Sequence, residues 1–381
     1  MNRSVQSSSR MPWLDNVKMV ALLCVIIGHT THLFANGLPG RMMGFIVAFN
    51  MPLFVLLAGY TSYKALSRLD DYKSIVSSAE KVLWRLVIPG VCLSAFAQAN
   101  AGLLFARRLW MLFFAGVLLL YAISKVKETG KNIFLCFGLS AAKIITIGFL
   151  LMASAKLNMY WFLTMLMQIQ LTFYIGFYIG KFLFPPFLNI LFSGVILCII
   201  AYYLFGSWTF EMTSYFIIGL VMKHQGWFER LFTTSFFHCS IMLVLGVILL
   251  RTFTIDYGFY AFGFDRLLSD GIIWVYVIRQ IVALLFSFVI IRLVYAMSAD
   301  YNWVSKMGKC SLAYYTIHVL ILEMWLKPNL FFENTNSYMW LCCLMAACAL
   351  TCITYIIIRI CEQWRVTRCL VLGEYHNCII K

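Results

Sequence analysis

Long apolar runs repeat along the chain and are separated by short stretches that hold most of the charged residues. A helix needs about 20 mainly apolar residues to cross the hydrocarbon core of a bilayer. Twelve runs are candidate spans, and ten would remain if one of the weaker adjacent pairs did not cross the membrane. We therefore expect an all-α polytopic transmembrane bundle of 10–12 helices. The predicted spans are 17–35, 42–63, 82–104, 109–124, 132–153, 160–180, 187–206, 211–222, 236–250, 272–296, 311–326 and 338–358.

Composition supports a membrane protein. Hydrophobic residues make up 62% of the 381 residues and charged residues only 12%, whereas ordinary soluble domains have about 45–50% and about 25%. No soluble fold could bury that much apolar surface. We therefore expect one transmembrane domain over 17–360, with a cytoplasmic segment at 1–16 and a cytoplasmic tail at 361–381.

The net charge of +15 would suggest nucleic-acid binding in a soluble protein. Here the basic residues are unevenly distributed between the two sides of the predicted spans. If the N-terminus lies inside, the inner segments carry far more Lys and Arg than the outer ones, which is the pattern of the positive-inside rule. The sequence therefore predicts that both termini are cytoplasmic, and no nucleic-acid partner is expected.

The first span holds the strongest candidate residues, because ionisable groups at membrane depth are costly and often functional. Lys18 and His29 are eleven residues apart, which places them on one helix face about 16 Å apart along the axis. His29 is either a structural histidine or a general base or nucleophile, since imidazole titrates near physiological pH. Lys18 could also be an anchor that reaches the lipid phosphates, and Asp15 is close enough to pair with it.

The second span contains helix-perturbing residues. Pro52 removes one helical hydrogen bond and is expected to kink the helix, while Gly59 would allow another backbone to approach closely. Such a perturbation is tolerated where the helix lines a cavity or is buried in protein. Asn50 and Tyr60 flank this stretch and are candidate supporting residues.

Other candidates lie at the ends of later spans. Lys81 and Arg85 fall at the cytoplasmic start of a span, Trp161 at an outer boundary, and His318 at depth in a late span. Taken singly, basic and aromatic residues at such boundaries are more often anchors than site residues. No Cys/His spacing typical of a metal site is present, so we expect no metal.

The order of these motifs resembles the membrane-bound acyltransferase-3 family, and the resemblance extends over most of the chain. The motifs are Leu14-Asp15-Asn16-Val17-Lys18 and Gly28-His29, Asn50-Met51-Pro52-Leu53-Phe54 and Ala58-Gly59-Tyr60, Arg85-Leu86-Val87-Ile88-Pro89, Trp161-Phe162-Leu163, and Ser311-Leu312-Ala313-Tyr314-Tyr315-Thr316-Ile317-His318.

The resemblance implies a multi-pass enzyme of the bacterial inner membrane. Such an enzyme moves an acyl group, most often acetyl, from cytoplasmic acyl-coenzyme A to a hydroxyl of an exported or cell-surface glycan or its lipid-linked precursor. Acyl-coenzyme A is then a donor substrate and not a permanently bound cofactor. The residues implicated are His29 in catalysis, Lys18, Arg85 and Lys81 in binding acyl-coenzyme A, and Asp15, Asn50, Gly59, Tyr60, Trp161 and His318 in support.

Three positions depart from the family pattern. This chain has Lys18 where Arg is usual, Asn50 where His is usual, and Ala58 where Ser is usual. Lysine keeps the positive charge but loses the planar fork that binds phosphate with two hydrogen bonds. The role of the second-span motif is therefore left open.

Two chemical routes and two other functional classes remain compatible with the sequence. His29 could deprotonate the acceptor hydroxyl for direct attack, or take the acyl group itself and pass it on. A transporter or flippase of a glycan, lipid or small solute would also use broken helices and buried polar groups, although no inverted repeat is evident. A receptor or scaffold without chemistry is the third class.

Overall fold

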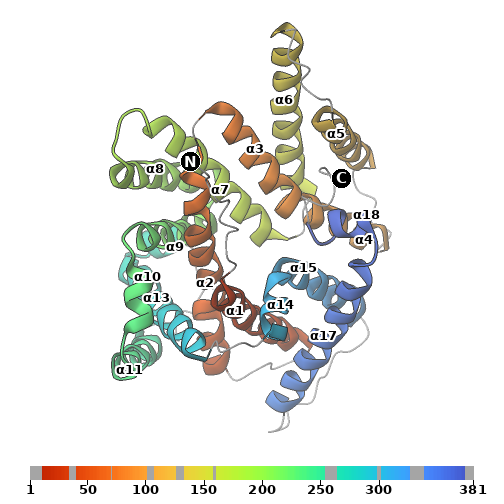
Figure 1. Ribbon diagram of the computed structural model, residues 1–381. Helices are drawn as coiled ribbons and strands as arrows, with labels where there is room; N and C mark the ends of the chain where they lie inside the picture. Colours follow the sequence, from red (N-terminus) through yellow and green to blue (C-terminus); the bar gives the residue numbers. More distant parts are fainter. Residues whose placement is uncertain are drawn as a thin grey trace, which may run out of the picture.

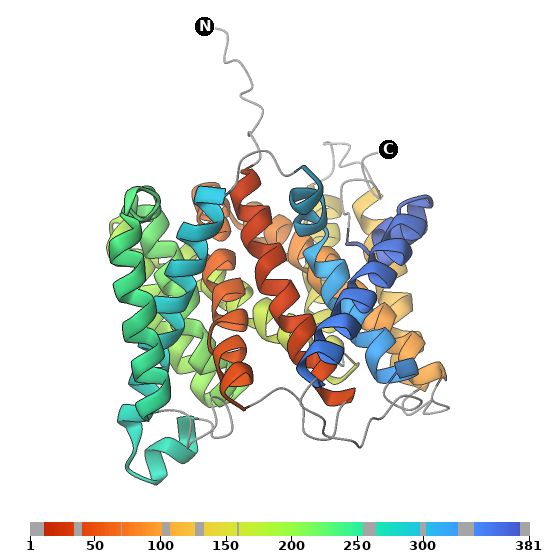
Figure 2. The ribbon, with the colours of Figure 1, turned by 90° about the horizontal axis from the view of Figure 1, so that it is seen from below.

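A computed structural model describes residues 11–33, 40–69, 71–100, 107–125, 133–157, 160–253, 264–297, 302–326 and 339–373. Within these ranges the secondary structure is helical and contains no strand. The helices stand side by side in one bundle (Figures 1 and 2). The predicted all-α polytopic architecture is confirmed.

Within the described residues, each predicted span falls on helical elements. The principal helices are α1 (Pro12–Thr30), α2 (Gly40–Leu66), α4 (Ile88–Asn100), α5 (Arg107–Lys125), α6 (Ile133–Leu157), α7 (Trp161–Gly180), α8 (Pro186–Ile200), α9 (Ser207–His224), α11 (Phe236–Phe253), α13 (Ile273–Met297), α15 (Ser311–Ile321) and α17 (Met339–Cys361). The shorter elements are α3 (Tyr72–Val82), α10 (Trp227–Thr233), α12 (Phe264–Ser269), α14 (Asn302–Lys309), α18 (Arg365–Leu370), the 3-10 turn η1 (Thr31–Leu33) and the π-helical turns η2 (Leu83–Val87), η3 (Ala201–Phe205) and η4 (Leu322–Leu326).

Fewer helices than predicted meet the length and hydropathy expected of a complete span. Among the described residues 6 do so, or 7 when α10 and α11, bent by 103°, are counted as one. At the predicted spans 109–124, 132–153 and 311–326, the described residues form the shorter apolar helices Trp110–Ile123, Ala141–Ala153 and Ser311–Met324. The described part of the predicted span 82–104 begins at the end of α3, passes through the π-turn η2 and continues in α4.

Two ends of the bundle can be defined from α1. Helix α1 begins, and α17 ends, at the same face (Figure 2), which we call the proximal face; the opposite face is the distal face. Lys18 therefore lies near the proximal face and His29 toward the distal face. Both residues lie on the single helix α1, as the sequence predicted.

The helices α2 and α9 cross at very close range. A methyl group at Gly59 would overlap the carbonyl oxygen of Phe216, and one at Gly219 would overlap the carbonyl oxygen of Leu56. Two glycines facing opposite backbones are typical of close helix contacts in membranes. The predicted close approach at Gly59 is confirmed, and α2 continues through Pro52 as one helix up to Leu66.

Buried ionisable groups outside the first span have structural partners. Lys143 of α6 lies 2.5 Å from Glu80 of α3, so the pair joins these helices. Glu211, which is 1% exposed, accepts a hydrogen bond from the backbone N–H of Phe264 at 2.8 Å. These contacts hold α3 on α6 and α12 on α9.

Candidate functional site

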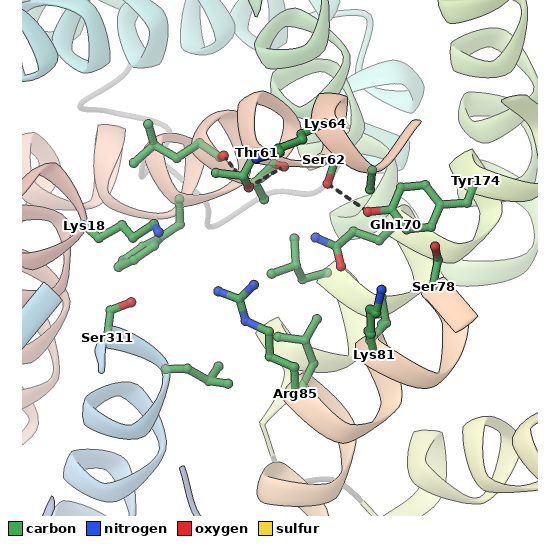
Figure 3. Close-up of a pocket in the computed structure, with 18 of the residues that line it drawn as sticks. Lys18, Thr61, Ser62, Lys64, Ser78, Lys81, Arg85, Gln170, Tyr174 and Ser311 are labelled. Carbon is green, nitrogen blue, oxygen red and sulfur yellow. Dashed lines mark hydrogen bonds between the residues drawn. The ribbon is translucent and has the colours of Figure 1, made fainter. Parts of the chain in front are cut away.

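A cavity of about 540 Å³ lies among α1, α2, α3, η2, α7 and α15 at the proximal end of the bundle (Figure 3). Among the described residues that line it there are five basic side chains and no acidic one. Hydroxyl and amide groups add hydrogen-bonding capacity. The basic residues are Lys18, Lys64, Arg68, Lys81 and Arg85, and the polar ones are Thr61, Ser62, Ser74, Ser77, Ser78, Gln170, Tyr174, Ser311 and Tyr315.

Helix α3 places a row of these groups on one wall. Its N-terminus is fixed by a capping box, in which the Asp71 carboxylate accepts from the backbone N–H of Ser74 at 2.8 Å. Residues three or four apart share one helix face. Ser74, Ser78 and Lys81 therefore lie in line along the cavity.

The π-turn η2 continues this wall to Arg85. Pro89 has no N–H, so it cannot donate to the carbonyl of Arg85 as a regular helix requires. The chain instead widens by one residue, and the Ile88 N–H donates to the carbonyl of Leu83. Single π-turns of this kind are frequent at functional sites. Figure 3 shows the Arg85 side chain extending into the cavity opposite Lys18.

Lys18 is paired as the sequence predicted. Its Nζ lies 3.6 Å from a carboxylate oxygen of Asp15, one turn earlier on α1. The Lys18 side chain is 19% exposed and that of Asp15 is 7% exposed. Asp15 therefore holds the ammonium group at the cavity wall without lining the cavity itself.

A second cavity, of about 230 Å³, lies toward the distal end. It brings together three residues predicted from the sequence, His29, Asn50 and Trp161. Trp208 completes an aromatic pair with Trp161, their ring centroids being 6.2 Å apart. The remaining lining residues are Val25, Gly28, Val47, Met51 and Met212.

His29 forms a pair with His318, which is completely buried. Nδ1 of His29 lies 3.1 Å from Nε2 of His318, and Nδ1 of His318 lies 2.7 Å from the carbonyl oxygen of Tyr314. A carbonyl only accepts, so Nδ1 of His318 carries the proton and its Nε2, in the neutral ring, is an acceptor. His29 must then donate from Nδ1.

This assignment fixes the chemistry available at His29. With its proton on Nδ1, the neutral imidazole of His29 keeps its lone pair on Nε2. A lone pair on a positioned imidazole is what a general base or a nucleophile requires. The structure therefore brings His318, the histidine of the last motif, into contact with His29.

Three aromatic rings connect the lining of the proximal cavity to the histidine pair. Phe54, Phe162 and Tyr315 line the proximal cavity, and the Phe162 ring lies 6.0 Å from that of Phe54 and 5.4 Å from that of Tyr315. Tyr315 in turn lies 5.9 Å from the His318 ring. We call these three residues the aromatic partition.

Two predicted supporting residues lie elsewhere. Tyr60 lines neither cavity and packs in an aromatic cluster, 5.5 Å from Trp13 and 4.5 Å from Phe228. Gly59 acts at the crossing of α2 and α9. Gly59 and Tyr60 belong to the same motif as Asn50. Unlike Asn50, they do not line the distal cavity.

Several cavity residues were not identified from the sequence. Lys64 and Arg68 follow the second span and resemble ordinary cytoplasmic anchors, and Gln170 and Tyr174 lie inside an apolar helix. The repeated spacing of Ser74, with Ser77 or Ser78, and then Lys81 was the available signal, because it describes one polar helix face.

Comparison with known proteins agrees with this geometry. A family model described as an acyltransferase domain, of the acyltransferase-3 type, matches residues 11–358. No curated protein and no solved structure matches the chain. The match extends from the start of α1 into α17 and includes both cavities and the aromatic partition. The chain therefore belongs to the acyltransferase-3 family and is a membrane acyltransferase.

Proposed function

We propose that this protein is an O-acyltransferase that uses cytoplasmic acyl-coenzyme A, with acetyl as the preferred acyl group. The acceptor is a hydroxyl of an exported or cell-surface glycan or of its lipid-linked precursor, and the membrane is the bacterial inner membrane. The observation that carries the proposal is the arrangement along α1, where a basic cavity at Lys18 and the oriented imidazole of His29 occupy opposite ends.

The proximal cavity suits the nucleotide end of the donor. Coenzyme A carries a diphosphate and a 3′-phosphate. A cationic donor makes stronger hydrogen bonds to phosphate oxygens than a neutral donor does. Lys18 approaches from α1, opposite the wall that carries Lys81 and Arg85, so the cations can contact separate phosphates. The Arg85 guanidinium supplies the planar fork that Lys18 lacks.

The side of the membrane follows from the same charges. The proximal face holds the basic cavity, and basic residues concentrate on the cytoplasmic side of membrane proteins. Placing this face in the cytoplasm also exposes the cavity to the compartment that contains acyl-coenzyme A. The N-terminal segment 1–16 and the tail 361–381 are then cytoplasmic, and 17–360 forms the transmembrane domain.

His29 supplies the base for acyl transfer. In the direct route, Nε2 takes the proton of the acceptor hydroxyl, whose oxygen attacks the thioester carbonyl; the C–S bond breaks and the thiolate leaves, to be protonated from His29. In the two-step route, Nε2 itself attacks the carbonyl, the C–S bond breaks and the thiolate leaves. The acceptor hydroxyl oxygen then attacks the acyl-imidazole, the C–N bond breaks, and the freed Nε2 takes the hydroxyl proton and passes it to the thiolate. Both routes use the same lone pair.

The distal cavity supports a glycan acceptor. Trp161 and Trp208 are 48% and 40% exposed and present broad apolar faces beside His29. The Asn50 amide can both donate and accept hydrogen bonds, which suits a ring bearing several hydroxyls. An acceptor hydroxyl held there would lie beside the imidazole.

The test uses full-length protein in vesicles loaded with labelled acetyl-coenzyme A and supplied with candidate glycans outside. Transfer of label to the glycan with release of coenzyme A is the expected result. The competing function is a transporter or flippase, which broken helices would also suit. Accumulation of a glycan or solute in vesicles without any acyl donor, and no transfer of label, would replace the proposal by transport.

A further inference from the structure

The aromatic partition lies at the part of the proximal cavity nearest the histidine pair, because the Tyr315 ring is 5.9 Å from that of His318. Phe162 and Tyr315 are each 5% exposed, and the Phe162 ring contacts those of Phe54 and Tyr315 in tilted geometries. The partition residues are chain neighbours of distal-cavity residues: Phe162 follows Trp161, and Phe54 lies one turn after Asn50. The rings therefore lie where the proximal cavity approaches the distal one.

The cavity wall changes character toward this layer. The basic groups come from α1, α2, α3 and η2, and most of the serines come from α3, whereas apolar residues adjoin the rings. The apolar group consists of Leu57, Ala58, Leu166 and Leu312. If phosphates occupy the basic part, the acyl end of the donor meets the apolar part and then the partition.

The partition is held in place from two helices. The hydroxyl of Tyr160, two residues before Phe162, donates to the carbonyl of Thr316 at 3.0 Å, and Thr316 follows Tyr315. The start of α7 is thereby tied to α15. Phe162 and Tyr315 have little freedom to move apart, because the backbone segments that carry them are joined.

We propose that Phe54, Phe162 and Tyr315 form an acyl-length filter that restricts the donor to short acyl groups such as acetyl. The proposal rests on acyl-coenzyme A being the donor. Phe162 is the central member, since its ring contacts both others. A longer acyl chain would have to displace packed aromatic rings, and packed interiors resist such overfilling.

The experiment measures how acetyl-, butyryl- and hexanoyl-coenzyme A compete with labelled acetyl-coenzyme A for the purified full-length protein. In the wild type, affinity should fall as the chain lengthens, with hexanoyl at least about tenfold weaker than acetyl. Phe162→Ala opens the end of the cavity, so the order of affinities should reverse, with hexanoyl-coenzyme A binding most tightly and acetyl-coenzyme A most weakly. Each additional buried methylene should then improve binding by up to about fourfold.

Two further sets of variants guard against misfolding and detergent effects. Phe54→Leu and Phe162→Leu keep an apolar core residue. They should reduce the wild-type preference for acetyl-coenzyme A over the longer thioesters, but less than Phe162→Ala does. Phe173→Ala removes a fully buried ring of the same helix that packs on Phe216 at 5.5 Å outside the cavity, and should keep the wild-type order. Arg85→Ala should weaken all three competitors together, which separates binding in the cavity from partition into micelles.

The outcomes separate the filter from the donor assignment. If the wild type binds none of the three thioesters, both the donor assignment and the filter are overturned. If the wild type binds them but Phe54 and Phe162 variants keep the wild-type order, the filter alone is overturned. The same holds if Phe173→Ala changes the order as Phe162→Ala does, because the effect would then be a general loosening of the bundle.

Discussion

Nδ1 of His29 lies 3.1 Å from Nε2 of His318, although 289 positions separate the two residues. The contact joins α1 to α15, and the Tyr314 carbonyl fixes its direction by accepting from the other nitrogen of His318. In the proposed mechanism, His318 positions His29, and His29 is the residue that meets the reacting groups.

Replacing His318 should lower kcat and leave the KM for acyl-coenzyme A unchanged. His318→Ala removes the acceptor that holds the proton on Nδ1 of His29, and a positioned base contributes about 10²-fold or more. In His318→Gln the amide oxygen can accept the same hydrogen bond, so part of the rate should return. Steady-state kinetics of both variants, with His224→Ala as a histidine outside both cavities, tests this; equal losses for Ala and Gln would contradict it.

Removing the basic groups of the proximal cavity should weaken donor binding. Lys18→Ala and Arg85→Ala each delete a charge-assisted hydrogen bond worth about 1.5–3 kcal/mol, so the KM for acetyl-coenzyme A should rise by roughly 10- to 100-fold. Arg85→Lys should lose less because the charge remains. Lys223→Ala is the control, since Lys223 pairs with Glu229 at 3.3 Å and does not line the cavity.

The same variants can identify the residue that holds the 3′-phosphate. Dephospho-coenzyme A, which lacks the 3′-phosphate, should bind the wild type more weakly than coenzyme A does. In the variant that lacks the cation contacting the 3′-phosphate, removing this phosphate should cause no further loss of affinity. Competition measurements with dephospho-coenzyme A show which of the two residues is insensitive. If loss of the 3′-phosphate weakens binding to both variants as much as to the wild type, neither Lys18 nor Arg85 contacts this phosphate.

Gly59→Ala should destabilise the fold without touching either cavity. The added methyl group would overlap the Phe216 carbonyl oxygen, and overfilling a packed contact costs about 1–3 kcal/mol. Gly148→Ala is the matched control, because no atom lies within 4 Å of its added Cβ. Thermal unfolding of both in detergent should show a lower midpoint for Gly59→Ala only; similar midpoints would refute the close crossing of α2 and α9.

Glu80→Gln should also destabilise the bundle. Lys143 would keep its charge after losing a carboxylate at 2.5 Å, and breaking a buried pair from one side costs about 3 kcal/mol. Exchanging the two residues, as Glu80→Lys with Lys143→Glu, should recover much of the loss. The midpoints of thermal unfolding of the single and double variants test this prediction. A double variant with a midpoint no higher than those of the single variants would count against the pairing.

The helices were predictable because membrane spans need long apolar runs, and each predicted run is helical. Where a span is divided was less predictable. The π-turn before α4 reflects Pro89 together with the packing of its neighbours, and hydropathy alone does not register it. Gly59 was correctly predicted as a contact point, but its partner on α9 depends on the tertiary fold.

The candidate site was predictable only in part. Lys18, His29, Asn50, Trp161 and His318 were identified as individual residues, because polar or aromatic groups stand out in apolar runs. Their division into two cavities was not, since sequence order does not show which helices face each other. Tyr60 belongs to a predicted motif yet packs among aromatic rings outside both cavities, a position that sequence order does not show.

The most direct test is the rate at which His29→Ala transfers labelled acetyl from acetyl-coenzyme A to glycan in vesicles. Acetyl-coenzyme A binding, measured in parallel, should match the wild type, while transfer should fall by about 10²-fold or more. His224→Ala should transfer at the wild-type rate. Wild-type transfer by His29→Ala would contradict the assignment of the imidazole as base or nucleophile.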